Sequence, residues 1–387
     1  MKRPLFVLFL VVFVDLLGFG MVIPLMPRYA KQLGAPVELI GLLSTGYSAA
    51  QFLFAPLWGR LSDRVGRRPV LLVSIAMTSA AFLAYGLAES FWLLLATRLF
   101  AGVATANLPI AYAYVADVTT EENRAKGMGV IGAAFGLGFV LGPALGGILA
   151  GTALGLGAPG FAAAGLAALN LVLAFFILPE PARRDTRAPG APGRFALLRQ
   201  LAGDSHMVRL LLCYFFAIGA FAAMENTLSL AAADRFGLHD QQIGYVFAFV
   251  GVVLVVVQGG LIGPLTRRFG ETRLLVAGLF LMALALALLP VVPGVPGLLA
   301  VMVPLAAGSG LMQPSVTALI SRRAAANVQG GALGVAQSAS AMGRIVGPES
   351  GTFVYQLAPA SPFLGAAVVM AFAGILGLTL GRPKPPL

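Results

Sequence analysis

The chain has 387 residues, of which 59% are hydrophobic and only 11% are charged, and its mean hydropathy is +0.91. So few charged residues cannot cover the surface of a water-soluble protein of this length, so the composition excludes a soluble globular protein and places the chain in a membrane. The formal net charge of +11 would also suit a nucleic-acid-binding protein, but the distribution of the basic residues argues against that function.

Apolar stretches of about 20 residues recur along the chain, and each is long enough to cross a hydrocarbon core of about 30 Å as a helix. The first follows only Met1-Lys2-Arg3-Pro4 and has no convincing cleavage site, so we expect a retained helix and not a signal peptide. We predict an all-α integral membrane protein with twelve transmembrane helices. The predicted spans are residues 5–26, 40–58, 70–88, 92–115, 127–150, 160–178, 208–231, 242–262, 274–292, 298–320, 331–356 and 361–380.

The basic residues lie mostly in alternate loops. With an even number of helices both termini lie on one side, and that side collects most of the 26 Lys and Arg residues, whereas the other side has Arg28, Lys31 and Arg235. The positive-inside rule predicts that both termini are cytoplasmic and that the protein lies in the cytoplasmic (inner) membrane, without a nucleic-acid partner. The single cysteine, Cys213, excludes a disulfide framework.

One long polar segment, rich in Pro, Gly and Arg, divides the predicted helices six and six. At an offset of 204 or 205 residues the two halves also match weakly: GRLSDRVGRR (59–68) falls on GPLTRRFGET (263–272), and Asp117 falls on Arg322. Such a repeat predicts two pseudo-symmetric six-helix bundles with a substrate site near mid-membrane between them. The predicted domains are residues 1–178 and 208–387, joined by a cytoplasmic linker at 179–207.

Charged residues inside membrane helices are costly and by default mark ion or substrate pathways. Apart from Arg209 at the very start of the seventh span, the predicted spans contain five, Asp15, Arg98, Glu225, Arg344 and Glu349, and all five are candidate proton-coupling residues. Each could instead form an ion pair that only holds helices together, and Arg344 could pair with Glu349 one turn away. A carboxyl group in an apolar cavity can load and release a proton near neutral pH, so we expect this role of Asp15 and Glu225 above all.

Glycine and proline residues mark a further motif in the predicted fifth helix. Gly138, Gly142 and Gly146 recur at a spacing of four, which places them on one helix face and lets another helix approach closely. Pro143 removes a backbone hydrogen bond and predicts a kink, and a second Gly-Pro pair at 347–348 suggests the same bend in the other half. The glycines could also form an ordinary packing seam.

These motifs resemble those of the major facilitator superfamily, and within it the 12-helix drug/proton antiporter group with its tetracycline and multidrug efflux pumps. GRLSDRVGRRPV (59–70) is similar to the motif of the loop between helices 2 and 3, and RLFAGVATAN (98–107) to the helix-4 motif. DLLGFGMVIPLMP (15–27) is similar to the helix-1 pattern of drug exporters, with Asp15 at the acidic position. The antiporter motif is matched by Gly138, Gly142, Pro143, Gly146 and Gly147.

The resemblance implies roles for these residues. Asp63, Arg67 and Asp117 would form a cytoplasmic charge cluster, a conformational latch that closes when the protein faces outward; Gly59, Arg64, Gly66 and Arg68 complete its motif. Arg98 would assist proton movement, and Gly142 with Pro143 would lock the fifth helix against leakage. The second half has Arg267 where Asp63 would repeat, so we expect no equivalent latch there, and Glu349 replaces a small residue.

An enzyme has little support in the sequence. His206 and His239, the only histidines, both lie at predicted helix ends, so no histidine triad or His-rich metal site is expected inside the membrane. The glycine runs lack the context of a phosphate-binding loop, so ATP is not the expected energy source. We expect a monomer with no cofactor and no metal. We expect a proton gradient to drive the transport.

We therefore predict a secondary active exporter that exchanges protons for lipophilic or cationic drugs by alternating access. The alternatives are a proton-coupled or facilitated exporter of sugars, amino acids or lipid-like metabolites, and an uncoupled channel or transporter-like sensor. Several of the expected cavity residues could simply form helix–helix hydrogen bonds. The expected cavity residues are Asp15, Tyr47, Gln51, Asn107, Tyr112, Glu225, Asn226 and Gln313.

Overall fold

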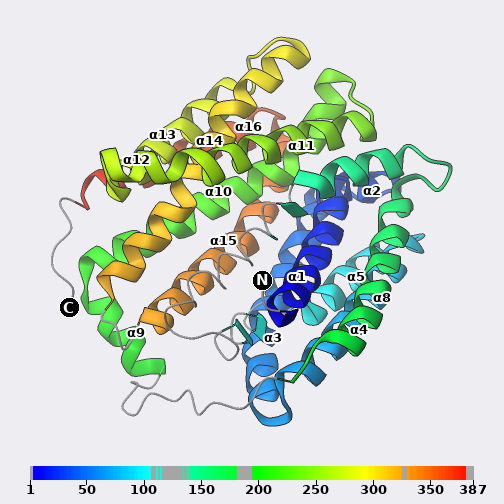
Figure 1. Ribbon diagram of the computed structural model, residues 1–387. Helices are drawn as coiled ribbons and strands as arrows, with labels where there is room; N and C mark the ends of the chain where they lie inside the picture. The colour runs from blue at the N-terminus through cyan, green and yellow to red at the C-terminus, as the bar shows by residue number, and fades with distance from the viewer. Residues whose placement is uncertain are drawn as a thin grey trace. The chain divides into compact units, whose positions relative to one another are not determined.

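All regular secondary structure among the described residues of the computed structural model is helical (Figure 1). The structure describes residues 3–105, 110–111, 114–115, 134, 137–138, 140–180, 194–324 and 329–380. The helices are α1 (Arg3–Val22), α2 (Met26–Gln32), α3 (Val37–Val65), α4 (Arg67–Gly86), α5 (Phe91–Ala104), α8 (Ala158–Ile177), α9 (Arg194–Gly203), α10 (Ser205–Phe236), α11 (Asp240–Val256), α12 (Ile262–Phe269), α13 (Glu271–Leu288), α14 (Gly294–Arg323), α15 (Gln329–Leu357) and α16 (Ser361–Leu378). A further apolar helix covers Val140–Ala150.

Within the described part of the chain, eight helices are long and apolar enough to cross a membrane, or nine if α1 and α2 count as one bent span. The prediction of an all-α integral membrane protein is confirmed. The predicted spans at 92–115 and 127–150 lie partly outside the described residues.

The predicted first span, residues 5–26, is wrong as a single helix. Helix α1 ends at Val22, and α2 begins at Met26 with a bend of 44°. Pro24 has no N–H to continue the helical ladder, and the N–H groups of Leu25 and Met26 turn to carbonyls only three residues back. Two prolines within four residues, Pro24 and Pro27, therefore break the span, and the second stands in the first turn of α2, where it costs little.

The charged segment 59–70 is not a loop, as the sequence suggested, but mostly helix. Helix α3 continues through Val65, and Gly66 alone separates it from α4. Gly66 has a φ of 117°, a conformation that favours glycine. Gly270 joins α12 to α13 in the same way, with a φ of 77°, so the two halves share this one-residue junction in the register of the predicted repeat.

The chain forms two compact units. The first contains Met1–Asp185 and Leu228–Gly251, and the second contains Thr186–Thr227 and Val252–Leu387. In the first unit α4 packs on α8 and α5, and α1 packs on α8; in the second, α13 packs on α14 and α16. The division at 178 and 208 into two six-helix domains stays a prediction.

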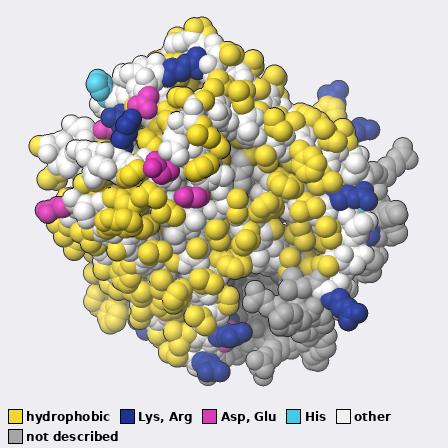
Figure 2. All heavy atoms as spheres, turned by 180° about the vertical axis from the view of Figure 1, so that it is seen from behind, with side chains coloured by type: hydrophobic (Ala, Val, Ile, Leu, Met, Phe, Trp, Pro, Cys, Tyr) yellow, Lys and Arg dark blue, Asp and Glu magenta, His cyan; other side chains and the backbone are white. Residues whose placement is uncertain are grey.

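Both units expose large apolar side chains. Phe176 is 79% exposed, and Val291 and Val368 are 70% and 69% exposed. Hydrophobic side chains cover most of the face in Figure 2, and the charged ones gather towards its edges. Lipid tails are as apolar as these side chains, so exposure in the bilayer costs little, and helix packing has to come from close contacts between small residues.

Candidate functional site

Backbone contacts at glycine form two matching helix seams. A Cβ atom added to Gly142 would lie 2.8 Å from the Cα of Gly20 on α1. In the second unit a Cβ on Gly347 of α15 would overlap the carbonyl oxygen of Gly219 on α10. In each unit, therefore, the helix that carries the Gly-Pro pair packs closely on another helix, which is α1 in the first unit and α10 in the second. These contacts leave no room for a side chain at the glycine positions.

The other glycines of the antiporter motif share this packing. Gly138 and Gly146 face Leu16 and Met21 of α1, and Gly147 faces Gly244 of α11, which belongs to the first unit. The packing seam that the glycine spacing allowed as an alternative is therefore present. A locking role for Gly142 and Pro143 stays a prediction.

A polar cluster in the first unit brings together three of the predicted residues. The Tyr47 hydroxyl lies 2.7 Å from Oγ1 of Thr105, whose own proton goes to the carbonyl of Ala101, so Tyr47 donates this bond. Gln51 donates to the backbone carbonyl of Thr105 over 3.3 Å. The Arg98 guanidinium stacks over the Tyr47 ring, with its carbon 4.6 Å from the ring centroid. Thr105, which the sequence pattern did not indicate, is the centre of the cluster.

Arg98 is buried without a counter-charge among the described residues. It is 2% exposed, and its Nε and Nη2 have no hydrogen-bond partner there. A desolvated cation–π contact contributes about 2 kcal/mol, less than the several kcal/mol that it costs to bury a charge. The expected structural alternative, an internal ion pair of Arg98, is not formed in the part of the chain that the structure describes. Arg98 can therefore still accept an anionic partner.

Asp15 is half-buried on α1 and lies one turn before Phe19, whose ring packs on Tyr47 with centroids 5.3 Å apart. Residues one turn apart share a helix face, so Asp15 lies on the face of α1 that is turned to the Tyr47 cluster. Two further predicted cavity residues, Asn107 and Tyr112, lie outside the described residues.

The second unit carries the acidic candidates. Glu225 lies half-buried in α10, and the described residues form no ion pair with it. Arg344 of α15 is close enough to act on Glu225 electrostatically, and it donates a hydrogen bond of 2.7 Å to the Ser340 hydroxyl. No ion pair joins Arg344 to Glu349, whose Oε2 is buried without a hydrogen-bond partner in the described part of the chain. The pair of Arg344 and Glu349 that the sequence left open is therefore not formed.

The remaining cavity candidates differ. Asn226 is 4% exposed and donates to the carbonyl of Ala222 in its own helix, so this bond is not the helix–helix hydrogen bond allowed for above. Gln313 is exposed on α14. The chain thus brings together Tyr47, Gln51 and Arg98 in one unit, and Glu225 and Arg344 in the other.

The predicted latch motif lies at the junction between α3 and α4. Arg67 pairs with Asp63 at 2.6 Å and also donates to the Ser62 hydroxyl. The Glu180 carboxylate, which the sequence did not single out, accepts the backbone N–H groups of Arg67 and Arg68 at 2.7 and 2.9 Å. This carboxylate satisfies orphan donors at the positive end of α4. A Cβ on Gly66 would lie 2.8 Å from Glu180 Oε1, so glycine is needed there for space as well.

The other latch residues are less constrained. Arg68 donates to the carbonyl of Phe175 and stacks on its ring, which ties α4 to α8. Arg64 is exposed, and a Cβ on Gly59 would meet no atom within 4 Å. Asp117 lies outside the described residues, so the latch itself stays a prediction.

The second half has its own ion pair at the corresponding junction. Glu271, in the first turn of α13, pairs with Arg322 of α14 at 2.8 Å. The predicted repeat places Glu271 on Arg67 and Arg322 on Asp117, so the charges occupy matching positions with their signs exchanged. The sequence comparison placed Asp117 on Arg322 but did not consider Glu271 as a partner for that arginine, and so it missed this pair.

Asp204 anchors the start of α10. Its carboxylate accepts a bidentate bond from Arg323, at 2.6 and 3.2 Å, and the backbone N–H of His206. The Arg323 hydrogen bonds, helped by the N–H groups of His206 and Met207, hold the pKa of the Asp204 carboxyl below its usual range.

Two ion pairs join α2 to the end of α10 and the start of α11. Arg28 pairs with Asp240 at 2.8 Å and also donates to the carbonyl of Leu238. Lys31 pairs with Asp234 at 2.8 Å. All four residues belong to the first unit, and the sequence had singled out Arg28 and Lys31 only as rare basic residues of the non-cytoplasmic side.

No group of His, Cys, Asp and Glu side chains in the described ranges could hold a metal ion. Membrane-length helices with close glycine seams and charged side chains set within them define a multi-pass helical membrane transporter.

Comparison with known proteins agrees with this class. The family model described as "Major Facilitator Superfamily" matches residues 8–348 and 210–387, and the chain belongs to this superfamily of transporters, which are not enzymes. It is 33% identical over 378 residues to the tetracycline resistance protein, class C, of Escherichia coli, covering 96% of this chain and 94% of that one.

Two further relatives bear on function. The chain is 30% identical over 385 residues to multidrug resistance protein 2 of Bacillus subtilis, covering 98% of this chain and 95% of the other. The solved structure of the human organic anion transporter MFSD10 (TETRAN) matches with a TM-score of 0.73 and 30% identity, over 97% of this chain and 99% of that one.

Proposed function

We propose that this transporter exports amphipathic or cationic drugs in exchange for protons by alternating access. Glu225 carries the proposal, because it is a carboxylate set in a membrane helix without an ion pair among the described residues. A carboxylate that is not neutralised by a fixed partner is free to take either a proton or a cation. The drug and tetracycline resistance proteins to which the chain is similar support the choice of cargo.

In this scheme proton and substrate compete for one group. The ionised carboxylate attracts a cationic substrate, and protonation removes that attraction and releases it. Arg344 of α15 acts electrostatically on this carboxylate, so it can influence which of the two ligands binds. Asp15 and Glu349 are the other proposed proton-coupling groups. We also propose that both termini are cytoplasmic in an inner membrane and that a monomer is the transporting unit.

Everted vesicles energised to be acid inside test this function. Adding a lipophilic cation to them should release protons, and Glu225→Gln should abolish that release, because an amide neither ionises nor carries a proton. Glu89→Gln, which changes an exposed glutamate in the same way, should leave release unchanged. If substrate still moves without any proton response over a broad compound panel, proton coupling is wrong and facilitated transport replaces it.

A second candidate function is the export of organic anions. Arg98 favours it, because this guanidinium is buried without a counter-ion in the described part of the chain and could take a carboxylate or sulfonate. The human relative MFSD10 is itself described as an organic anion transporter, which supports the same class of cargo.

The two candidates predict opposite patterns. Arg98→Gln should abolish transport of an organic anion if anions are the cargo, and Glu225→Gln should then have the smaller effect. With a cationic cargo, Glu225→Gln should have the larger effect. Uptake of matched cationic and anionic fluorophores into the vesicles separates the two outcomes.

A further inference from the structure

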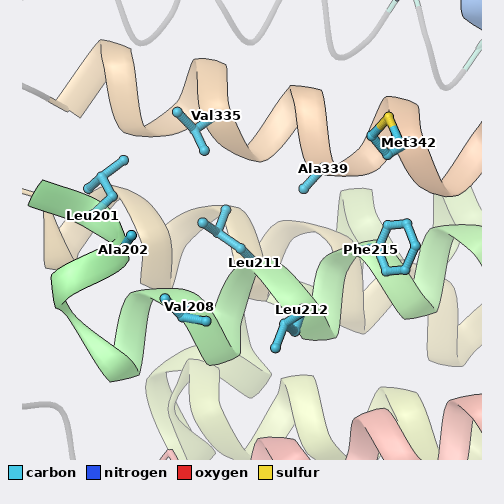
Figure 3. Close-up of a pocket in the computed structure, with 9 residues that line it drawn as sticks. All are labelled: Leu201, Ala202, Val208, Leu211, Leu212, Phe215, Val335, Ala339 and Met342. Carbon is cyan, nitrogen blue, oxygen red and sulfur yellow. The ribbon is translucent and has the colours of Figure 1, made fainter. Parts of the chain in front are cut away.

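An apolar groove of about 430 Å³ lies between the corner of α9 and α10 and the face of α15 (Figure 3). Leu201, Leu211 and Phe215 line it from α9 and α10, and Val335, Ala339 and Met342 line it from α15. All of these residues belong to the second unit, and the groove is within the size range of ligand pockets.

The chemistry of this groove does not suit the proposed substrate. None of its nine lining residues carries a polar side chain, whereas sites for drug-like molecules place a few polar groups for orientation. Glu225 lies about 15 Å further along α10 than Phe215, at a helical rise of about 1.5 Å per residue. An occupant of the groove must therefore be hydrocarbon, and the groove is separate from the proposed coupling site.

The position of the groove indicates a lipid chain. It begins where the membrane-length helix α10 begins, at a point of the chain where Asp204, paired with Arg323, and Arg209 lie within two residues of its lining residues Ala202 and Val208. Charged side chains of this kind mark the level of the lipid headgroups. From there the groove follows the first turns of α10 as far as Phe215, so a chain that entered at headgroup level would lie along the helix.

Charge at the mouth of the groove selects the headgroup. Arg199 is exposed on α9, two residues before Leu201 of the lining and about half a helical turn away from it. Each basic residue near a membrane surface attracts anionic lipid by about 1 kcal/mol.

We propose that the groove binds an acyl chain of an anionic phospholipid from the leaflet that adjoins α9, with the headgroup phosphate at Arg199. The α9 helix then serves as the rim of a lipid site.

Native mass spectrometry of the purified full-length protein tests this site, with phosphatidylglycerol and phosphatidylcholine of identical chains as probes. Ala339→Phe fills the groove from α15 and should lower bound phosphatidylglycerol at least fivefold. Val335→Phe should do the same from one turn away. Ala287→Phe, the same change at an exposed alanine of α13 in the same unit, should leave lipid binding unchanged.

Arg199→Gln tests the headgroup. It should bring the ratio of bound phosphatidylglycerol to phosphatidylcholine close to one, while total lipid changes little. Unchanged lipid binding in both groove-filling variants, with the fold intact by thermal unfolding, overturns the site, and an unchanged ratio in Arg199→Gln overturns the choice of headgroup. Displacement of the lipid by tetraphenylphosphonium would assign the groove to substrate and also overturn the proposal. None of these readouts depends on transport.

Discussion

Single residues set the geometry of the junctions. Gly66 has a φ of 117° and a ψ of 157°, a region of backbone conformation that is essentially restricted to glycine. Its missing side chain also leaves the space that the Glu180 carboxylate uses to reach the N–H groups of α4. Two independent requirements therefore fall on one residue.

Gly66→Ala should destabilise the protein by about 1–3 kcal/mol, because alanine would adopt a strained backbone and push against Glu180. Thermal unfolding of the purified protein in detergent measures this loss. The control is Gly59→Ala, because a Cβ there meets no atom within 4 Å and alanine favours the helix. Equal melting temperatures for the two variants would contradict the required conformation of Gly66.

Asp204 is the residue whose contribution should depend on pH. Arg323 lowers the pKa of this carboxyl in the folded protein, so the unfolded chain binds more protons at acid pH, and the stabilisation is present above the usual carboxyl pKa of about 3.9. It is lost as the pH falls through the lowered value.

Melting temperatures of wild-type protein and Asp204→Asn between pH 3 and pH 8 check this linkage. The difference between them should be largest near neutral pH and shrink towards pH 3. Asp63→Asn should show a much smaller difference, because its carboxylate is 63% exposed and solvent screens its pair with Arg67. A difference for Asp204→Asn that does not vary with pH would contradict the role of its carboxylate.

At the scale of elements, hydrophobic stretches predicted the helices well, because a span of about 20 apolar residues has few alternatives in lipid. Their ends could not be predicted in the same way. The polar residues 59–65 suggested a loop, yet they are helical. The break in the chain is set at Gly66, and Glu180 caps the helix that follows it, so neither feature could be found within the segment itself. Only the Pro24 break had a local signal that the sequence could have provided.

Charge pairs were predicted less well, because a sequence gives no distances between helices. The Arg344–Glu349 pair followed from spacing along one helix, but Arg344 acts instead on Glu225 of the neighbouring helix. Glu271 and Arg322 lie on different helices, so the spacing of residues along one helix could not predict their pair. Comparing the halves for exchanged signs, and not for identity, would have found it.

The Glu271–Arg322 pair predicts a test by charge exchange. Glu271→Arg and Arg322→Glu should each lower the transport rate, because each places like charges 2.8 Å apart in the present geometry. The double variant restores opposite charges and should recover most of the rate. Arg322 is 71% exposed, so we expect little change in overall stability, and vesicle transport is the measurement. A double variant that is as slow as the worse single one would contradict the pair.

At the scale of the whole molecule, contacts within the first unit tie α2 to the end of α10 and the start of α11. Arg28, Lys31, Asp234 and Asp240 are the charged residues of this contact, around a cavity of about 280 Å³. The alternating access that we propose needs contacts that break and re-form, and partly exposed ion pairs of modest strength suit that task.

Neutralising this contact should make the turn more accessible. In a Cys213→Ala background, Ala233→Cys places a reporter in the lining of the 280 Å³ cavity. We expect Asp234→Asn with Asp240→Asn to speed its reaction with a membrane-impermeant maleimide roughly threefold, because exposed pairs each contribute about 0.2–1 kcal/mol. Glu38→Gln with Glu89→Gln is the control. Unchanged labelling would mean that the ion pairs do not hold the contact closed.

The carboxylate of Glu225 also has an electrical consequence. One group that trades one proton for one monovalent cation moves no net charge through the bilayer in a full cycle. A membrane voltage, which acts on a transferred charge with about 2.3 kcal/mol per 100 mV, would then do no work on the exchange. The pump would draw on the acidity difference alone, and a cell could keep expelling such a compound while its membrane is depolarised.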